Sequence, residues 1–175
     1  MAMYRAKDEG RNSFQLFEPA MNARSLERLA LETALHRALP RDELQLYFQP
    51  VMKAEGGELV AVEALLRWRH PDLGLVSPAD FIPLAEDTGL IVPIGEWVLR
   101  EACRQVARWR DAGLGIVRVA VNVSYRQFIG EDLAETVRRI LDEFQLPGAA
   151  LELEFTERVL IEDAPDTLRT FADLR

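Results

Sequence analysis

Four short segments of the chain alternate polar and apolar residues, and this alternation limits the possible folds more than any other feature. The segments are Leu44–Met52, Glu58–Arg69, Val117–Ser124 and Ala150–Thr156. Side chains on a β-strand point to opposite faces in turn, so each segment predicts a strand with one apolar and one polar face. The apolar faces require a covering layer, and the polar faces require water or a ligand.

The connections between these segments predict how the strands pair. Residues 54–57 (Ala-Glu-Gly-Gly) form a turn signal, so the first two strands are expected to be an antiparallel hairpin. After the hairpin, apolar residues at helical spacing mark one long helical region centred on Ile94–Arg110. A second helix is expected with Leu133 to Phe144 along one face, and a further helix from Ala164. Because helix-length crossovers join parallel strands, the later strands are expected to run parallel in an α/β fold.

The polar faces are unusual for a parallel sheet. Such sheets are normally covered on both sides, and their strands are then almost wholly apolar. A carboxylate buried there without a partner would cost several kcal/mol, so the polar positions indicate a hydrated, functional interior. The alternative is an antiparallel sheet with its polar face in plain solvent, which the helix-length connections disfavour.

Three oxygen-bearing side chains and one arginine share this polar parity. Glu63, Asn122 and Glu154 occupy three successive predicted parallel strands, and their oxygens suit Mg²⁺ or Mn²⁺ better than Zn²⁺. Arg67 follows Glu63 by four residues on the same face, and its planar guanidinium could hold a phosphate. The set favours phosphate-ester chemistry, although a glutamate and an arginine on one strand can also be a plain ion pair.

Composition excludes several other classes of protein. The formal net charge is −8 and the isoelectric point is about 4.9, which disfavours a DNA- or RNA-binding protein. Cys103 is the single cysteine, so no intramolecular disulfide or multi-cysteine zinc site is possible, and a cytoplasmic location is expected. Cys103, His36 and His70 are all interpreted as structural or solvated. No apolar run in this chain approaches the roughly 18 residues of a membrane span, although a longer parent protein could be anchored upstream.

The residues of the second strand resemble a known family. Glu63-Ala64-Leu65-Leu66-Arg67-Trp68 is similar to the signature of the EAL domain, the bacterial cyclic-di-GMP phosphodiesterase family. The resemblance covers residues 27–175. It includes four further motifs in the same order: Tyr47-Gln49-Pro50, Phe81-Ile82-Pro83-Leu84-Ala85-Glu86, Asn122-Val123-Ser124, and Glu154-Phe155-Thr156-Glu157. It implies the first half of an EAL-type TIM (β/α)8 barrel with an initial antiparallel strand, preceded by a linker helix.

The resemblance also implies a role for individual residues. Glu63, Asn122 and Glu154 match the metal ligands of the family, and the full domain would hold two Mg²⁺ or Mn²⁺ ions. Arg67 matches the arginine on the substrate phosphate, while Leu65 and Gln49 match substrate-contacting positions. The implied reaction is hydrolysis of cyclic-di-GMP to linear pGpG. No complete catalytic set is expected in this chain, because the family's Asp-Asp-Phe-Gly-Thr-Gly motif and catalytic lysine do not occur in it.

The predicted domain organisation has three parts. Residues 1–17 resemble the C-terminal tail of a GGDEF (diguanylate cyclase) domain, residues 18–40 a linker helix, and residues 41–175 a truncated EAL domain. A TIM barrel takes about 250 residues, so the chain is expected to be an inactive piece of a longer phosphodiesterase. A non-hydrolysing cyclic-di-GMP receptor or interaction module and a gene remnant stay open as alternatives. The full-length parent could in addition form a homodimer.

Overall fold

The computed structural model describes residues 19–114, 117–130 and 133–155. The predicted tail over residues 1–17 and the helix expected from Ala164 lie outside these residues. The chain divides into two compact units, Met1–Arg37 and Ala38–Arg175. Helix α2 (Pro19–Ala38) occupies most of the segment predicted as a linker helix. No helix in the described residues is both long enough and apolar enough to cross a membrane.

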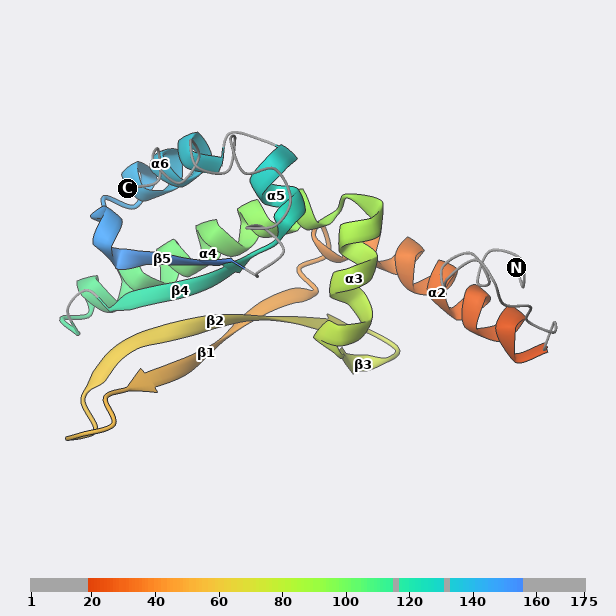
Figure 1. Ribbon diagram of the computed structural model, residues 1–175, viewed down its shortest axis with the longest axis horizontal. Helices are drawn as coiled ribbons and strands as arrows, with labels where there is room; N and C mark the ends of the chain where they lie inside the picture. The colour runs from red at the N-terminus through yellow and green to blue at the C-terminus, as the bar shows by residue number, and fades with distance from the viewer. Residues whose placement is uncertain (1–18, 115–116, 131–132, 156–175) are drawn as a thin grey trace, which may run out of the picture. The chain divides into compact units, whose positions relative to one another are not determined.

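The second unit is built on a mixed sheet with the strand order β1-β2-β4-β5 (Figure 1). Strand β1 (Leu44–Met52) pairs antiparallel with β2 (Leu59–His70), which confirms the predicted hairpin. Strand β2 then pairs parallel with β4 (Arg118–Val123), and β4 pairs parallel with β5 (Leu151–Phe155). The α/β fold with an initial antiparallel strand is therefore confirmed.

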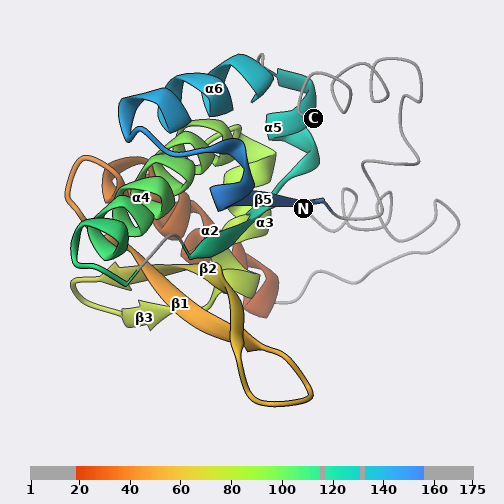
Figure 2. The same ribbon diagram turned by 90° about the vertical axis from the view of Figure 1, so that its left-hand side faces the viewer.

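The hairpin turn forms where the sequence predicted it. Gly56 and Gly57 adopt φ angles of +88° and +63°, a region in which a side chain would be strained. The Lys53 ammonium closes the turn with an ion pair of 2.6 Å to the Glu58 carboxylate. Figure 2 shows the turn projecting away from the helices that cover the sheet. The short strand β3 (Gly74–Val76), which pairs with the end of β2, was not predicted.

Helices supply the crossovers between the parallel strands. Two helices lie between β2 and β4, α3 (Pro78–Thr88) and α4 (Ile91–Asp111). Between β4 and β5 come α5 (Tyr125–Gly130), α6 (Leu133–Glu143) and the 3₁₀ turn η1 (Gly148–Ala150). The sequence predicted one helical region where α3 and α4 stand, and the break occurs at Gly89, whose φ of +80° ends α3 in a left-handed cap.

The core lies between the apolar face of the sheet and helix α4. Helix α4 packs against β4, α3, α5 and α6 and buries the face that the apolar spacing predicted. The strands contribute alternate residues to the same core, which are buried while their neighbours are not. The buried members from the two sides include Ile94, Val98, Ala102 and Val106 of α4, with Val62, Trp68, Val119 and Val121 of the sheet.

Candidate metal and phosphate site

The opposite face of the sheet gathers the polar residues into one surface. In the antiparallel pair, Gln49 lies opposite Glu63 and Gln45 lies opposite Arg67. In the parallel pairs, Glu63 of β2 is the register partner of Ala120 of β4, and Asn122 of β4 is the register partner of Glu154 of β5. Register partners on adjacent strands share a face, so the polar residues of all four strands point to the same side.

The three predicted metal ligands lie together on this surface. The Asn122 side-chain amide donates a hydrogen bond of 2.9 Å from Nδ2 to Oε1 of Glu63. Glu154 is the register partner of Asn122 on β5. Asn122 and Glu154 are each the penultimate residue of a parallel strand, at the carboxyl edge where α/β folds place their ligands.

Glu154 is electrostatically disfavoured as an anion. Reduced hydration raises the pKa of the Glu154 carboxyl above its usual range, and the negative charges of Glu63 and Glu152 raise it further. Arg118 forms a 3.0 Å ion pair with Glu152, so that neighbour has its own counterion. Glu63 and Glu154 lack such a partner among the interactions of the described residues, and their mutual repulsion favours a bound cation.

The donor set fits a hard divalent ion. Two carboxylates and an amide can supply three oxygen ligands, once the Asn122 amide turns its Oδ1 toward the ion in place of the nitrogen that now faces Glu63. Mg²⁺ typically takes one or two carboxylates and fills its octahedron with waters and substrate phosphate oxygens. Among the described residues, no group of three or more histidine, cysteine, aspartate and glutamate side chains is arranged to hold a metal ion, so the candidate set here depends on the amide of Asn122 as its third ligand.

Arg67 stands farther along β2 on the same face. Its Nη1 donates a 2.9 Å hydrogen bond to the carbonyl oxygen of Leu66, and its guanidinium carbon lies 5.5 Å from the ring centre of Tyr47. Within residues 19–114, 117–130 and 133–155 it forms no ion pair. A plain Glu63–Arg67 ion pair, the alternative left open by the sequence, is therefore not formed.

The remaining predicted residues complete this surface. Gln49 is exposed directly opposite Glu63, and Leu65 is half-buried opposite Tyr47. The structure thus brings Gln49, Leu65 and Arg67 onto the face that carries Glu63 and Glu154, which together are called the acidic cluster. Two further contributors were absent from the predicted site. Tyr47 and Glu152 share the parity of Gln49 and Glu154, a signal that could have identified both.

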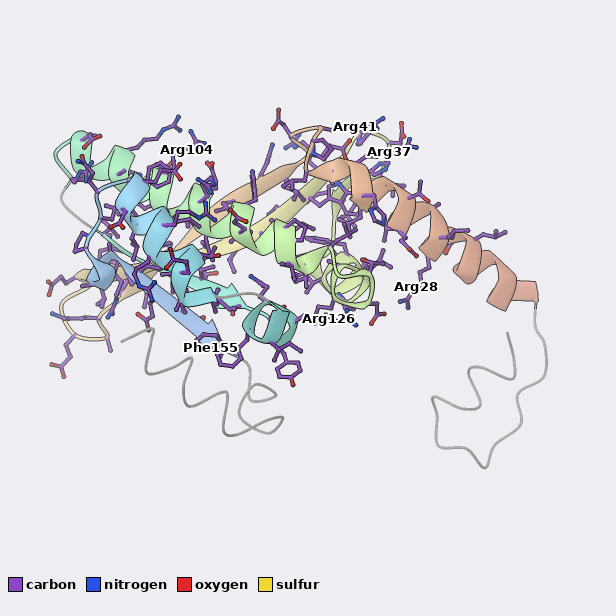
Figure 3. The ribbon with its side chains drawn as sticks, turned by 90° about the horizontal axis from the view of Figure 1, so that it is seen from above. Arg28, Arg37, Arg41, Arg104, Arg126 and Phe155 are labelled. Carbon is purple, nitrogen blue, oxygen red and sulfur yellow. The ribbon has the colours of Figure 1, made fainter. Side chains whose placement is uncertain are left out.

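The residues behind the site hold the strand ends in place. Figure 3 shows Phe155 at the end of β5 beside α5, where its ring meets that of Phe128 edge to face at 5.5 Å. The backbone N–H of Ser124, just after β4, donates a 3.1 Å hydrogen bond to Oε1 of the buried Gln127. These contacts lie on the helix side of the sheet and fix the strand ends that carry Asn122 and Glu154.

The fold and this surface define a class of protein: an α/β domain with a carboxylate-lined site at the ends of its parallel strands. The chain belongs to the EAL domain family, whose sequence model matches residues 32–175. The family assignment agrees with the resemblance carried by the residues around Glu63.

Named relatives share most of this chain. The chain is 49% identical over 167 residues to the bifunctional diguanylate cyclase/cyclic di-GMP phosphodiesterase MucR of Pseudomonas aeruginosa, covering 95% of this chain and 24% of that protein. It is 44% identical over 162 residues to the cyclic di-GMP phosphodiesterase PdeR of Escherichia coli, covering 93% of this chain and 24% of that protein. The chain therefore spans about a quarter of the length of these curated relatives.

Solved structures share the fold. A MucR phosphodiesterase in complex with c-di-GMP superposes with a TM-score of 0.79 and 46% identity, over 83% of this chain and 59% of that one. The EAL domain of Xanthomonas citri FimX in complex with c-di-GMP gives a TM-score of 0.75 and 25% identity, over 87% of this chain and 59% of that one. The sheet described above is thus part of an EAL-type barrel.

Proposed function

We propose that the protein carrying this chain is a metal-dependent phosphodiesterase that hydrolyses one phosphodiester bond of cyclic-di-GMP and releases linear pGpG. The observation that carries the proposal is that Glu63, Asn122 and Glu154 lie on one face of the sheet, where Asn122 is hydrogen-bonded to Glu63 and is the register partner of Glu154, with Arg67 on the same face. The names of MucR and PdeR support the substrate class.

Each residue has a distinct task in this proposal. Glu63 and Glu154 offer carboxylate oxygens to Mg²⁺ or Mn²⁺, and Asn122 offers its amide oxygen. Arg67 binds a phosphate oxygen through guanidinium N–H groups, and this contact orients the scissile bond relative to the acidic cluster. Gln49 and Leu65 contact the nucleotide from the neighbouring positions of β1 and β2. When bound, divalent ions supply Lewis-acid stabilisation of the developing charge and promote ionisation of the attacking water.

The direct test measures the conversion of cyclic-di-GMP to pGpG by the full-length protein, in the presence of Mg²⁺ or Mn²⁺ and again after chelation. Glu63→Gln and Glu154→Gln keep the size of each side chain while removing its charge. Both variants should lose metal binding and hydrolysis together, whereas Arg67→Met should raise the KM for cyclic-di-GMP. Chelation should abolish turnover in the wild type.

A matched control is available in the hairpin turn. Glu58 is also a carboxylate of the β1–β2 hairpin, but its partner is Lys53 and it lies far along the hairpin from Glu63. Glu58→Gln should hydrolyse cyclic-di-GMP like the wild type. Full turnover by Glu63→Gln would contradict the proposed site, and binding of cyclic-di-GMP without any hydrolysis by the wild type would show a receptor instead of an enzyme.

We also propose the domain order predicted from the sequence. Residues 1–17 would end a GGDEF domain, residues 18–40 would form the linker helix, and residues 41–175 would begin the EAL domain. The name of MucR, which combines a cyclase and a phosphodiesterase in one protein, supports the presence of both kinds of domain in the parent protein. The single cysteine, buried on α4, supports a cytoplasmic location for this segment.

A further inference from the structure

The guanidinium of Arg67 is held from one side by an aromatic ring. Tyr47 of β1 and Arg67 of β2 share the polar face, on adjacent same-face positions of the antiparallel pair. The guanidinium carbon lies 5.5 Å from the centre of the Tyr47 ring, within the range of a cation–π contact. The Tyr47 side chain is not part of the core, because the residue is 46% exposed on the face that carries the acidic cluster.

We propose that Tyr47 is a positioning residue that orients the Arg67 guanidinium for the substrate phosphate. The proposal rests on the proposed phosphodiesterase function and adds a residue to its binding site. Tyr47 acts through Arg67 and does not itself contact the phosphate.

The chemistry of guanidinium explains why an aromatic ring suits this task. A ring interacts with the flat face of the group, while phosphate oxygens bind the N–H donors along its edge. A carboxylate in the place of Tyr47 would occupy those donors and cancel the charge. The ring therefore restrains the side chain and leaves its edge free for an anion.

The second contact of Arg67 sets the direction of the group. Nη1 donates to the carbonyl oxygen of Leu66 at 2.9 Å, which engages one corner of the guanidinium. No other polar contact of this guanidinium is formed within the described residues. The ring of Tyr47 thus restrains the guanidinium on one side, and the Leu66 carbonyl engages one of its corners. The entropy lost when Arg67 binds a phosphate is correspondingly smaller.

The first experiment measures the order of the Arg67 side chain without any ligand. The ¹⁵N relaxation of the Arg67 Nε–H group is recorded for the wild type, Tyr47→Leu and Tyr47→Phe. Tyr47→Leu should make the group more mobile, and Tyr47→Phe, which keeps the ring, should restore the wild-type order. Equal order in the wild type and Tyr47→Leu would overturn the proposal.

The second experiment measures cyclic-di-GMP affinity and KM in the full-length protein at a fixed Mg²⁺ concentration. Tyr47→Leu should weaken binding about two- to fivefold, the size of a cation–π contact at an exposed position, with kcat nearly unchanged. Tyr47→Phe should bind like the wild type. Phe48→Leu is the structural control, because Phe48 faces the other side of β1 and meets Trp109 at 5.1 Å. It should lower the melting temperature without changing the affinity.

A double mutant separates positioning from direct contact. In an Arg67→Met background, Tyr47→Leu should have no further effect on affinity, because the group it positions is gone. An undiminished effect in that background would overturn the proposal and show that Tyr47 touches the ligand itself. An unchanged affinity of Tyr47→Leu, in a protein whose affinity falls with Arg67→Met, would also overturn it. Absence of cyclic-di-GMP binding by the wild type would instead refute the proposed function, while the relaxation data would still decide whether Tyr47 restrains Arg67.

Discussion

Gly95 offers the sharpest test of how the helix layer supports the site. It is a buried residue of α4, and α4 crosses α5 at this point. A Cβ atom at position 95 would lie 1.8 Å from Nε2 and 2.3 Å from Cδ of Gln127. Gln127 is only 7% exposed, so its side chain cannot simply swing into solvent. Gly95→Ala should therefore displace the side chain that accepts the hydrogen bond of Ser124.

The expected loss of stability follows from three contributions. Overpacking a core typically costs about 1–3 kcal/mol. Losing the hydrogen bond between Ser124 N–H and Gln127 adds about 1 kcal/mol. Replacing a helical glycine by alanine returns about 1 kcal/mol. The free energy of unfolding of Gly95→Ala should thus fall by about 2 kcal/mol, as measured by urea titration followed through tryptophan fluorescence.

A change of sign in a second background makes this prediction specific. Gln127→Ala removes the atoms that the new Cβ would meet. In that background Gly95→Ala should stabilise the protein by up to about 1 kcal/mol through helix propensity. The reasoning is refuted if Gly95→Ala destabilises both backgrounds equally, or if it stabilises the wild type.

Three further predictions concern charge and hydrogen bonding. The raised pKa of Glu154 means that the folded chain disfavours its ionised form. Without metal at pH 7, Glu154→Gln should therefore raise the free energy of unfolding by less than about 1 kcal/mol, and it should abolish stabilisation by Mg²⁺. A lower free energy of unfolding in urea titrations would contradict this. Burial, followed by the charge of Glu143, raises the pKa of the Cys103 thiol from 9.0 to about 11. Because the thiol of the unfolded chain ionises first, the free energy of unfolding should fall by about 2–3 kcal/mol between pH 9 and 11. Cys103→Ala should lack this part of the decline in urea titrations at several pH values. Arg110 donates from Nη1 to the carbonyl oxygens of Phe144 and Gln145, just after α6, at 3.2 and 3.0 Å. Arg110→Met should therefore lower the free energy of unfolding by about 1–2 kcal/mol. The control Arg108→Met, at an exposed position of the same helix, should change it by less than about 0.5 kcal/mol in thermal unfolding.

Local patterns predicted most of the framework. The two-residue alternation identified β1, β2, β4 and β5, and the apolar spacing identified α4 and α6. These signals are local, because side-chain direction along a strand or helix depends only on the backbone repeat. Short elements were missed for the same reason: β3 and α5 contain too few residues to show a period. The split between α3 and α4 depends on the left-handed conformation of Gly89, which apolar spacing does not register.

The residues of the candidate site could be proposed from the sequence, but their contacts could not. Glu63, Asn122 and Glu154 were found because parity and strand order survive in the one-dimensional pattern. The hydrogen bond from Asn122 to Glu63 depends on the register between β2 and β4, which the packing of α4 against the sheet helps to set.

The sequence by itself determined which side of each strand is polar, which residue types could hold a cation or a phosphate, and which family the chain resembles. Only the tertiary structure decided that Arg67 pairs with the ring of Tyr47 instead of the carboxylate of Glu63, and that Gly95 makes room for Gln127 behind the site. The physical reason is that side-chain partners are chosen by distances across strands and helices, and those distances exist only after the chain has packed.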